Sequence, residues 1–267
     1  MKKIIICLLL SVFAILVHTS LAQNDMAGYW MNKGIALDNL GNYPEAVKAY
    51  QNATQANSSS YMAWNSLGLE LMKLDKYNES IAAFDKVISI EPGFAWAAWN
   101  NKGLALAAIG NLKEAIDAYN IAIKIEPKNV NAWNNKGFAL LRTGDSNESI
   151  KAFDEAIKLD PTASLAWHYK GMALLSIGRI NESVTAFDSA VKIDPKFALA
   201  WNYMGIALTG LNRTQESINA FDNATKADPN YSEAWNNLGL TLNAIGRYQD
   251  AVNAFDKAIA TKGAESS

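Results

Sequence analysis

Tryptophan recurs along this chain at a nearly constant spacing. The seven residues are Trp30, Trp64, Trp99, Trp133, Trp167, Trp201 and Trp235, and successive ones are 34 residues apart except for one interval of 35. A leucine follows each of them by seven residues, and an aromatic residue follows by twenty. A period of this length restricts the chain to a repeat architecture, in which each unit packs on its neighbours along the sequence.

Positions within each repeat are numbered from the tryptophan, which is position 0. Position +4 is always glycine, and these glycines are Gly34, Gly68, Gly103, Gly137, Gly171, Gly205 and Gly239. Positions 0, +4 and +7 fall on one face of an α-helix, where the glycine leaves room for a second helix. We expect the tryptophans and glycines to form the packing surface between helices.

Each repeat is predicted to hold two helices. Position +11 is Gly in five repeats and Asp75 or Asn212 in the other two, as expected for a left-handed residue at a helix end. An acidic residue and proline at +27 and +28 should end the second helix in repeats two to six, because proline cannot continue it. The extra residue of the longer interval lies in the loop after Pro92.

The repeats account for nearly all of the chain. A four-residue lead, 23–26, precedes them, and a tail, 266–267, comes after them. The seven units, numbered 1 to 7, span residues 27–60, 61–95, 96–129, 130–163, 164–197, 198–231 and 232–265.

This pattern resembles the tetratricopeptide repeat (TPR) family, whose signature over 34 residues is W-x2-L-G-x2-Y, then A-x3-F, then P. The resemblance covers all seven units, although the family Tyr is Leu throughout and the Leu before Gly is Lys in four: Lys33, Lys102, Lys136 and Lys170. It implies an all-α, right-handed superhelical solenoid of antiparallel helix pairs. It also implies a non-catalytic scaffold for protein–protein interaction.

By the same resemblance, the first helix of each repeat lines a concave groove. Positions +1 and +2, which should face it, hold Asn32, Asn65, Asn100, Asn101, Asn134, Asn135, His168, Tyr169, Asn202, Tyr203, Asn236 and Asn237. Asparagine can pair with successive backbone amides, so we expect an extended peptide or a partner protein there. Position +5 is apolar and would form the groove floor. The alternative is that the asparagines bridge adjacent helices and the +5 residues belong to the core between repeats.

Other charged positions do not suggest a site. Cochaperone TPR domains that bind a C-terminal carboxylate carry Lys at +1 and Asn at +5, which are Met31 and Ile35 here. The recurrent Asp at +21 is expected on a solvated stripe, paired four residues onward as in Asp154–Lys158, Asp188–Lys192 and Asp222–Lys226.

The N-terminus has the pattern of a signal peptide. Lys2 and Lys3 precede an apolar run over residues 4–17, and small residues precede an expected cleavage between Ala22 and Gln23. The alternative for residues 1–22 is an uncleaved membrane anchor. We therefore expect an extracytoplasmic protein, either secreted, periplasmic or at the cell surface. Cleavage would leave 22 basic and 26 acidic residues, a charge that disfavours nucleic-acid binding.

Few side chains suit catalysis. The histidines are His18 and His168, and Cys7 is the one cysteine, so a His/Cys metal site cannot be assembled. No nucleophile–base pattern or phosphate-binding loop stands out. We expect no enzyme activity, no metal and no cofactor.

Eight Asn-x-Ser/Thr sequons make N-glycosylation a further prediction. They begin at Asn52, Asn57, Asn78, Asn147, Asn181, Asn212, Asn223 and Asn230. Asn78, Asn147 and Asn181 occupy one repeat position, where the alternative role is a helix cap. The alternative for the whole protein is a structural cell-surface glycoprotein that self-associates through the ends of the solenoid. Val252, Phe255 and Ile259 in the last helix would provide an apolar edge.

Overall fold

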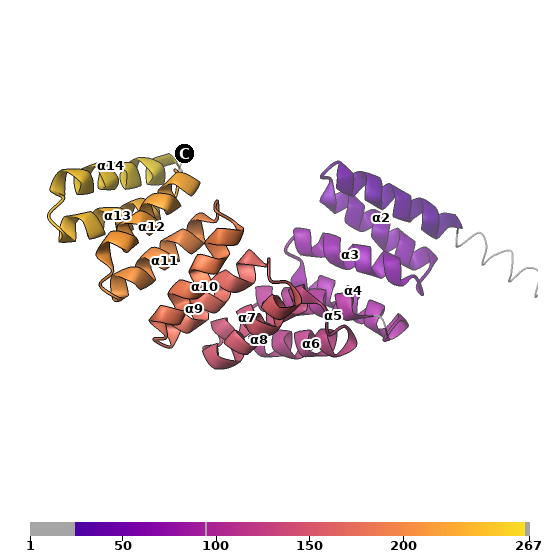
Figure 1. Ribbon diagram of the computed structural model, residues 1–267. Coiled ribbons are helices and arrows are strands. Elements are labelled where there is room, and N and C mark those ends of the chain that lie inside the picture. Colours follow the sequence, from indigo (N-terminus) through magenta and orange to yellow (C-terminus); the bar gives the residue numbers. More distant parts are fainter. Residues whose placement is uncertain (1–24, 94, 265–267) are drawn as a thin grey trace, which may run out of the picture. The chain divides into compact units, whose positions relative to one another are not determined.

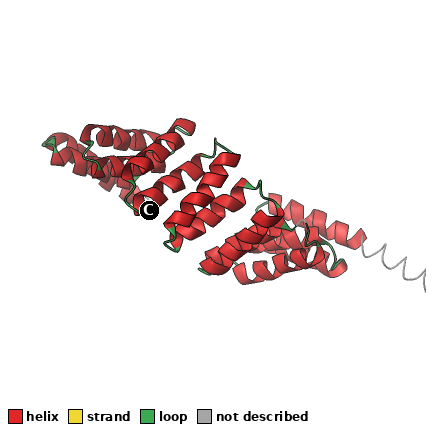
Figure 2. Ribbon diagram, turned by 60° about the horizontal axis from the view of Figure 1, so that its bottom comes forward, coloured by secondary structure: helices red, strands yellow, loops and turns green. Residues whose placement is uncertain are grey.

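The computed structural model describes residues 25–93 and 95–264, and all regular structure within them is helical (Figures 1 and 2). The predicted signal peptide, its cleavage site at Ala22 and Gln23, and the tail 266–267 lie outside the described residues. Part of the expected lead, 23–26, is helical, since the first helix already includes residue 25. None of the helices in the described ranges is both long and apolar enough to cross a bilayer.

Each repeat contains two helices, as predicted. The first helices are residues 25–39, α3 (Tyr61–Lys73), α5 (Trp96–Ala108), α7 (Val130–Arg142), α9 (Ser164–Ser176), α11 (Ala198–Gly210) and α13 (Ser232–Ala244). The second helices are α2 (Tyr43–Ala56), α4 (Tyr77–Ile90), α6 (Leu112–Ile125), α8 (Ser146–Leu159), α10 (Ile180–Ile193), α12 (Thr214–Ala227) and α14 (Tyr248–Ala264).

The helices form two compact units, Met1–Pro127 and Lys128–Ser267. Within each unit, every labelled second helix packs against the first helix that follows it and, from α4 onward, against the one that precedes it, where the unit contains them. First helices of neighbouring repeats also touch one another, as α3 touches α5 and as α9 touches α7 and α11. Because closer packing belongs to the inner side of a curved stack, the first helices form the inner side of each unit.

The turn between the two helices depends on the residue at +11. Five glycines there have φ between 72° and 87°, and Asp75 and Asn212 have φ of 56° and 57°. The left-handed conformation predicted for this position is confirmed. It lets the chain reverse direction within a few residues, so that the two helices of a repeat lie antiparallel.

Glycine at +4 brings the two helices of a repeat into close contact. An added Cβ on Gly68 would lie 2.7 Å from Cε1 of Phe84, and the other six repeats show distances of 2.5 to 2.7 Å to their aromatic residue at +20. A buried serine at +16 supports the same contact. The Ser80 hydroxyl donates to the Gly68 carbonyl at 2.8 Å, and Ser149 donates to Gly137 at the same distance.

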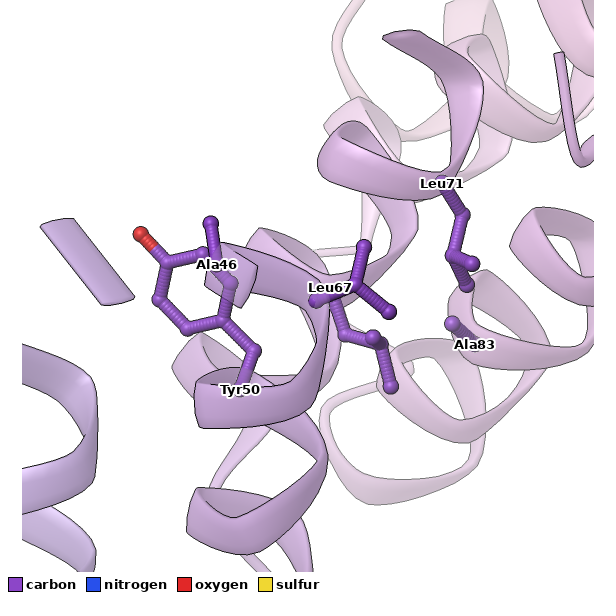
Figure 3. Close-up of a cluster of buried hydrophobic side chains, with 6 residues drawn as sticks. Ala46, Tyr50, Leu67, Leu71 and Ala83 are labelled. Carbon is purple, nitrogen blue, oxygen red and sulfur yellow. The ribbon is translucent and has the colours of Figure 1, made fainter. Parts of the chain in front are cut away.

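Consecutive repeats within a unit share their cores. Figure 3 shows such a cluster, in which Ala46 and Tyr50 of α2 lie near Leu67 and Leu71 of α3, with Ala83 of α4 beside them. The half-buried tryptophans also form hydrogen bonds between consecutive repeats. The indole N–H of Trp235 donates to the Pro229 carbonyl at 2.9 Å, in the loop that leaves the preceding repeat. Equivalent bonds are made by Trp64, Trp167 and Trp201.

Candidate functional site

The side chains expected to line the inner surface fall into two sets. At position +1, His168 and Asn202 are fully buried and Asn100 is 9% exposed. These three do not present free side chains to a groove, which corrects the prediction. The physical reason is that the +1 side chain faces the next repeat, as the contacts of Asn202 and His168 demonstrate.

Asn202 joins repeats 6 and 7 through hydrogen bonds. Its amide nitrogen donates to the Tyr231 hydroxyl at 3.1 Å and approaches a Glu233 carboxylate oxygen at 3.5 Å, while its oxygen accepts from Asn237 at 3.0 Å. Burial raises the pKa of the Tyr231 phenol above its ordinary value. The bridging alternative therefore holds for Asn202.

His168 fills the equivalent place between repeats 5 and 6 with a different chemistry. Its ring lies 4.9 Å from that of Phe197, 5.5 Å from that of Tyr203 and 5.6 Å from that of Phe187, measured between centroids. Neither ring nitrogen has a hydrogen-bond partner among the described residues. Burial lowers the pKa of His168 from 6.5 to about 4, because a charged imidazolium cannot be solvated there.

We expect His168 to make the protein acid-sensitive. The unfolded chain binds this proton near pH 6.5 but the folded chain only near pH 4, so the free energy of unfolding is greatest above pH 6.5. It should fall by up to about 3 kcal/mol as the pH drops to 4. Urea unfolding at several pH values, with His168→Phe as the comparison, measures the effect. An unchanged pH profile in the variant would contradict the assignment.

The residues at +2 and +5, and some of those at +1, reach the inner surface. At +2, Asn32 is exposed, and Asn101, Asn135, Asn237, Tyr169 and Tyr203 are partly exposed; at +1, Asn236 is exposed, and Asn65 and Asn134 are partly exposed. The oxygen of Asn134 is buried without a hydrogen-bond partner in the described structure. The +5 side chains Ile35, Leu69, Phe138 and Leu240 are 37 to 54% exposed.

In the second unit these rows produce an apolar surface, which we name the inner patch: Phe138, Leu165, Tyr169, Met172, Leu199, Tyr203 and Ile206. Leu165 and Leu199 are 47% and 39% exposed. The rings of Phe138 and Tyr169 lie 4.8 Å apart. Leu165 and Leu199 are at position −2, which lies on the same helix face as +2 and +5. Helical periodicity alone therefore predicts that they face the inner surface.

The glycosylation candidates differ in accessibility. Asn78, Asn147 and Asn181 are exposed but do not cap helices, which corrects that alternative: each is the second residue of its helix, after the caps Lys76, Asp145 and Arg179. The serines of these three sequons are fully buried. Asn230 is exposed in a loop, and the partly exposed Asn57 accepts hydrogen bonds from the backbone and hydroxyl of Ser59. Asn52, Asn212 and Asn223 lie within helices or at a turn.

The acidic stripe at +21 matches the expectation only in part. Asp188 pairs with Lys192, and Asp222 with Lys226, both at 2.5 Å. Asp154 does not pair with Lys158, which contacts Glu155 instead. Asp154 instead pairs with Lys170 of the next repeat at 2.6 Å. Lys170 stands at position +3, where the TPR signature has leucine.

A buried carboxylate that the repeat pattern does not indicate lies in the first unit. Glu70 is 3% exposed, although most repeats have alanine at its position, +6. One of its oxygens is 2.6 Å from the Lys73 ammonium, which also pairs with Asp38 of the preceding repeat. Burial lowers the pKa of Lys73, but hydrogen bonds to Asp38 and Glu70 raise it more, so the net shift is upward. These three side chains tie repeats 1 and 2 together.

Within the ranges that the structure describes, no three His, Cys, Asp or Glu side chains converge in a way that could hold a metal ion. The elements define a class of protein: a stack of antiparallel helix pairs that presents recurring helix-packing positions at each interface and variable side chains on an inner surface.

Comparison with known families identifies the repeats. Profiles described as "Tetratricopeptide repeat" match residues 31–93, 130–163, 165–197 and 204–266, and one described as "TPR repeat" matches 103–144. The chain belongs to the tetratricopeptide repeat family. No curated protein matches it in sequence.

Solved structures share the fold at low sequence identity. MamA from Desulfovibrio magneticus RS-1 is 23% identical with a TM-score of 0.58, covering 64% of this chain and 97% of that one. The C-terminal part of a TPR repeat-containing protein from Cytophaga hutchinsonii is 16% identical with a TM-score of 0.69, covering 86% and 95%. YrrB is 19% identical with a TM-score of 0.58, covering 70% and 96%.

Proposed function

We propose that this protein is a non-catalytic scaffold that binds an extended peptide or a partner protein on the inner surface of its repeats. The observation that carries the proposal is the inner patch. Its exposed side chains are Leu165, Leu199 and Phe138, and its tyrosines are partly exposed. They lie on a surface where each first helix adds side chains in the same order. Membership of the TPR family supports this role, as does the description of the similar YrrB as having a peptide-binding site.

The inner surface combines two kinds of contact. The partly exposed amides of Asn101 in the first unit and Asn135 in the second can each pair, on the inner surface of their own unit, with a peptide backbone without selecting its side chains. In the second unit, the inner patch can cover apolar side chains of a peptide whose backbone pairs with Asn135. His168 contributes packing, because it is buried without a polar partner. Nothing in this arrangement requires a metal or a cofactor.

Capture of partners by the chain from residue 23 onward tests the proposal, using native membranes and culture medium. We expect a stoichiometric partner that is lost when Asn101 and Asn135 are both changed to Ala, because the inner surface of each unit then loses an amide that can contact the peptide backbone. A second variant, Leu165→Ser with Leu199→Ser, should lose it too. Asn147→Ala, at an exposed asparagine on α8, is the matched control and should retain the partner.

A partner that all variants retain would overturn the inner-surface proposal. If the protein captures only itself and carries glycan masses, the structural-glycoprotein alternative replaces it. A specific observation favours that alternative. Val252 and Ile259 on α14 are 51% and 72% exposed, whereas their equivalents in repeat 5, Val184 and Val191, are 8% and 2% exposed.

The proposed site of action is outside the cytoplasm. This rests on the signal-peptide pattern of residues 1–22 and on the sequons, of which Asn57 and Asn230 are the proposed acceptors. The proposed domain limits remain seven units over residues 27–265. Mass measurement of the native protein tests cleavage after Ala22 and glycan attachment together.

A further inference from the structure

On the outer side of the repeats, two lysines of the chain each contact a tryptophan ring and a carboxylate. In repeat 3, the ammonium of Lys102 lies 5.1 Å from the centre of the Trp99 ring and 2.6 Å from a carboxylate oxygen of Asp85 in the preceding repeat. In repeat 5, Lys170 lies 5.3 Å from the Trp167 ring and 2.6 Å from Asp154. In these two repeats, the lysine at +3 thus stacks on the tryptophan of its own repeat and forms an ion pair with the +21 carboxylate of the preceding repeat.

The ion pair between repeats forms even where a lysine of the same helix could pair with the carboxylate. Asp154 has Lys158 one helical turn away, yet it pairs with Lys170. Lys170 is 22% exposed and Lys158 is 73% exposed, so the lysine across the boundary is the more buried. Where position +3 is not lysine, as with Met204 in repeat 6, the +21 carboxylate pairs locally: Asp188 contacts Lys192.

Repeat 7 has leucine at this position and an open pocket. The pocket has a volume of about 510 Å3 and lies between α12, α13 and α14. Trp235, Leu238 and Leu242 line it, and so does Asp222, the +21 carboxylate of the preceding repeat. The tryptophan and carboxylate that hold a lysine in repeats 3 and 5 are therefore both present, while Leu238 replaces the lysine.

The charges around this pocket are mostly paired. Asp222 contacts Lys226, and Asp250 contacts Arg247 at 2.7 Å. Lys257 is the remaining charge in the lining. Asp222 pairs with a lysine one turn along its own helix, whereas Asp154 pairs with Lys170, which lies over the tryptophan of the next repeat. An ammonium placed over Trp235 can therefore compete with Lys226 for Asp222.

We propose that the pocket between α12, α13 and α14 binds a lysine side chain of a partner protein. The aliphatic stem lies along Leu238 and Leu242, and the ammonium stacks on Trp235 and pairs with Asp222. This site is on the outer side of the repeats, so it is separate from the inner surface of the proposed function.

The first unit provides a natural control. A pocket of about 450 Å3 at repeats 1 and 2 has the same floor, formed by Trp64, Leu67 and Leu71. However, its +21 residue is Gln51, which has no charge, and the carboxylate in its lining, Glu79, is paired with Lys76 as Asp250 is paired with Arg247. It should bind a cation more weakly for that reason.

The test is a titration of the folded protein with n-butylammonium, which has the stem and charge of a lysine side chain, and with butyrate. The Trp indole 15N–1H resonances report on each pocket. We expect n-butylammonium to shift the Trp235 resonance in a saturable way and to shift Trp64 little. Asp222→Asn should weaken the binding roughly threefold to fivefold, since it removes the ion pair.

A second variant tests whether a lysine side chain of the chain itself can occupy the pocket. Leu238→Lys places the chain's own lysine in the pocket and should abolish the n-butylammonium shift at Trp235, whereas Leu67→Lys should leave it unchanged. Retention of the shift in Leu238→Lys would overturn the proposal. A larger shift with butyrate would overturn it as well, because Lys257 would then be attracting an anion.

Discussion

Gly171→Ala is expected to destabilise the protein by roughly 1–2 kcal/mol. An added Cβ would lie 2.6 Å from Cε1 of Phe187, and Phe187 is fully buried with His168 and Tyr203 against it, so the ring cannot move aside. Overpacking of this kind costs about 1–3 kcal/mol or more, against a gain of about 1 kcal/mol because alanine favours helix more than glycine does. Denaturant unfolding measures the difference.

Two variants separate packing from helix propensity. Gly28 lies in the first helix with no atom within 4 Å of an added Cβ, so Gly28→Ala should be neutral or slightly stabilising. Phe187→Leu in the Gly171→Ala background should recover part of the loss, because the smaller side chain makes room. Equal stability of Gly171→Ala and the unmodified protein would show that the helices of this repeat can separate without cost.

Lys73→Met is expected to destabilise the first unit by about 2 kcal/mol. The variant leaves the Glu70 carboxylate, 3% exposed, near Asp38 without its counter-charge. Removing one partner of a buried ion pair costs about 3–5 kcal/mol, and the loss should be smaller here because the Lys73 side chain is 40% exposed. Thermal unfolding together with hydrogen exchange of α3 measures the loss and locates it.

Glu70→Ala is the informative counterpart. Five other repeats have alanine at this position, so the variant should fit without strain and change the stability by no more than about 0.5 kcal/mol. The double variant should be close to Glu70→Ala alone, because the destabilising group is the unpaired carboxylate. Additive losses in the double variant would mean that Lys73 stabilises the unit by other contacts.

The fold could be predicted from the sequence because its information is local and repeated. The period of the tryptophans set the repeat length, and glycine, Asp75 and Asn212 at +11 located the turns where the backbone has positive φ. Acidic-Pro pairs located the ends of the second helices, as at Ile90 before Glu91. These residues act within one repeat, where helical periodicity and backbone sterics leave few alternatives.

The site was predictable only in outline. The rows at +1 and +2 look alike in the sequence, since both are rich in asparagine. Only the packing of one repeat on the next separates them: His168 and Asn202 are buried by it, and Asn101 and Asn135 are left at the surface.

The number of repeats, the helices, the turns and the glycine–aromatic contacts could all be read from the order of the residues. The packing of neighbouring repeats settled which polar groups are buried, the choice of Lys170 over Lys158 as the partner of Asp154, and the opening of a pocket at Leu238. These outcomes depend on side chains about 16 to 35 residues apart, and their competition for one partner is resolved only when adjacent repeats are in contact.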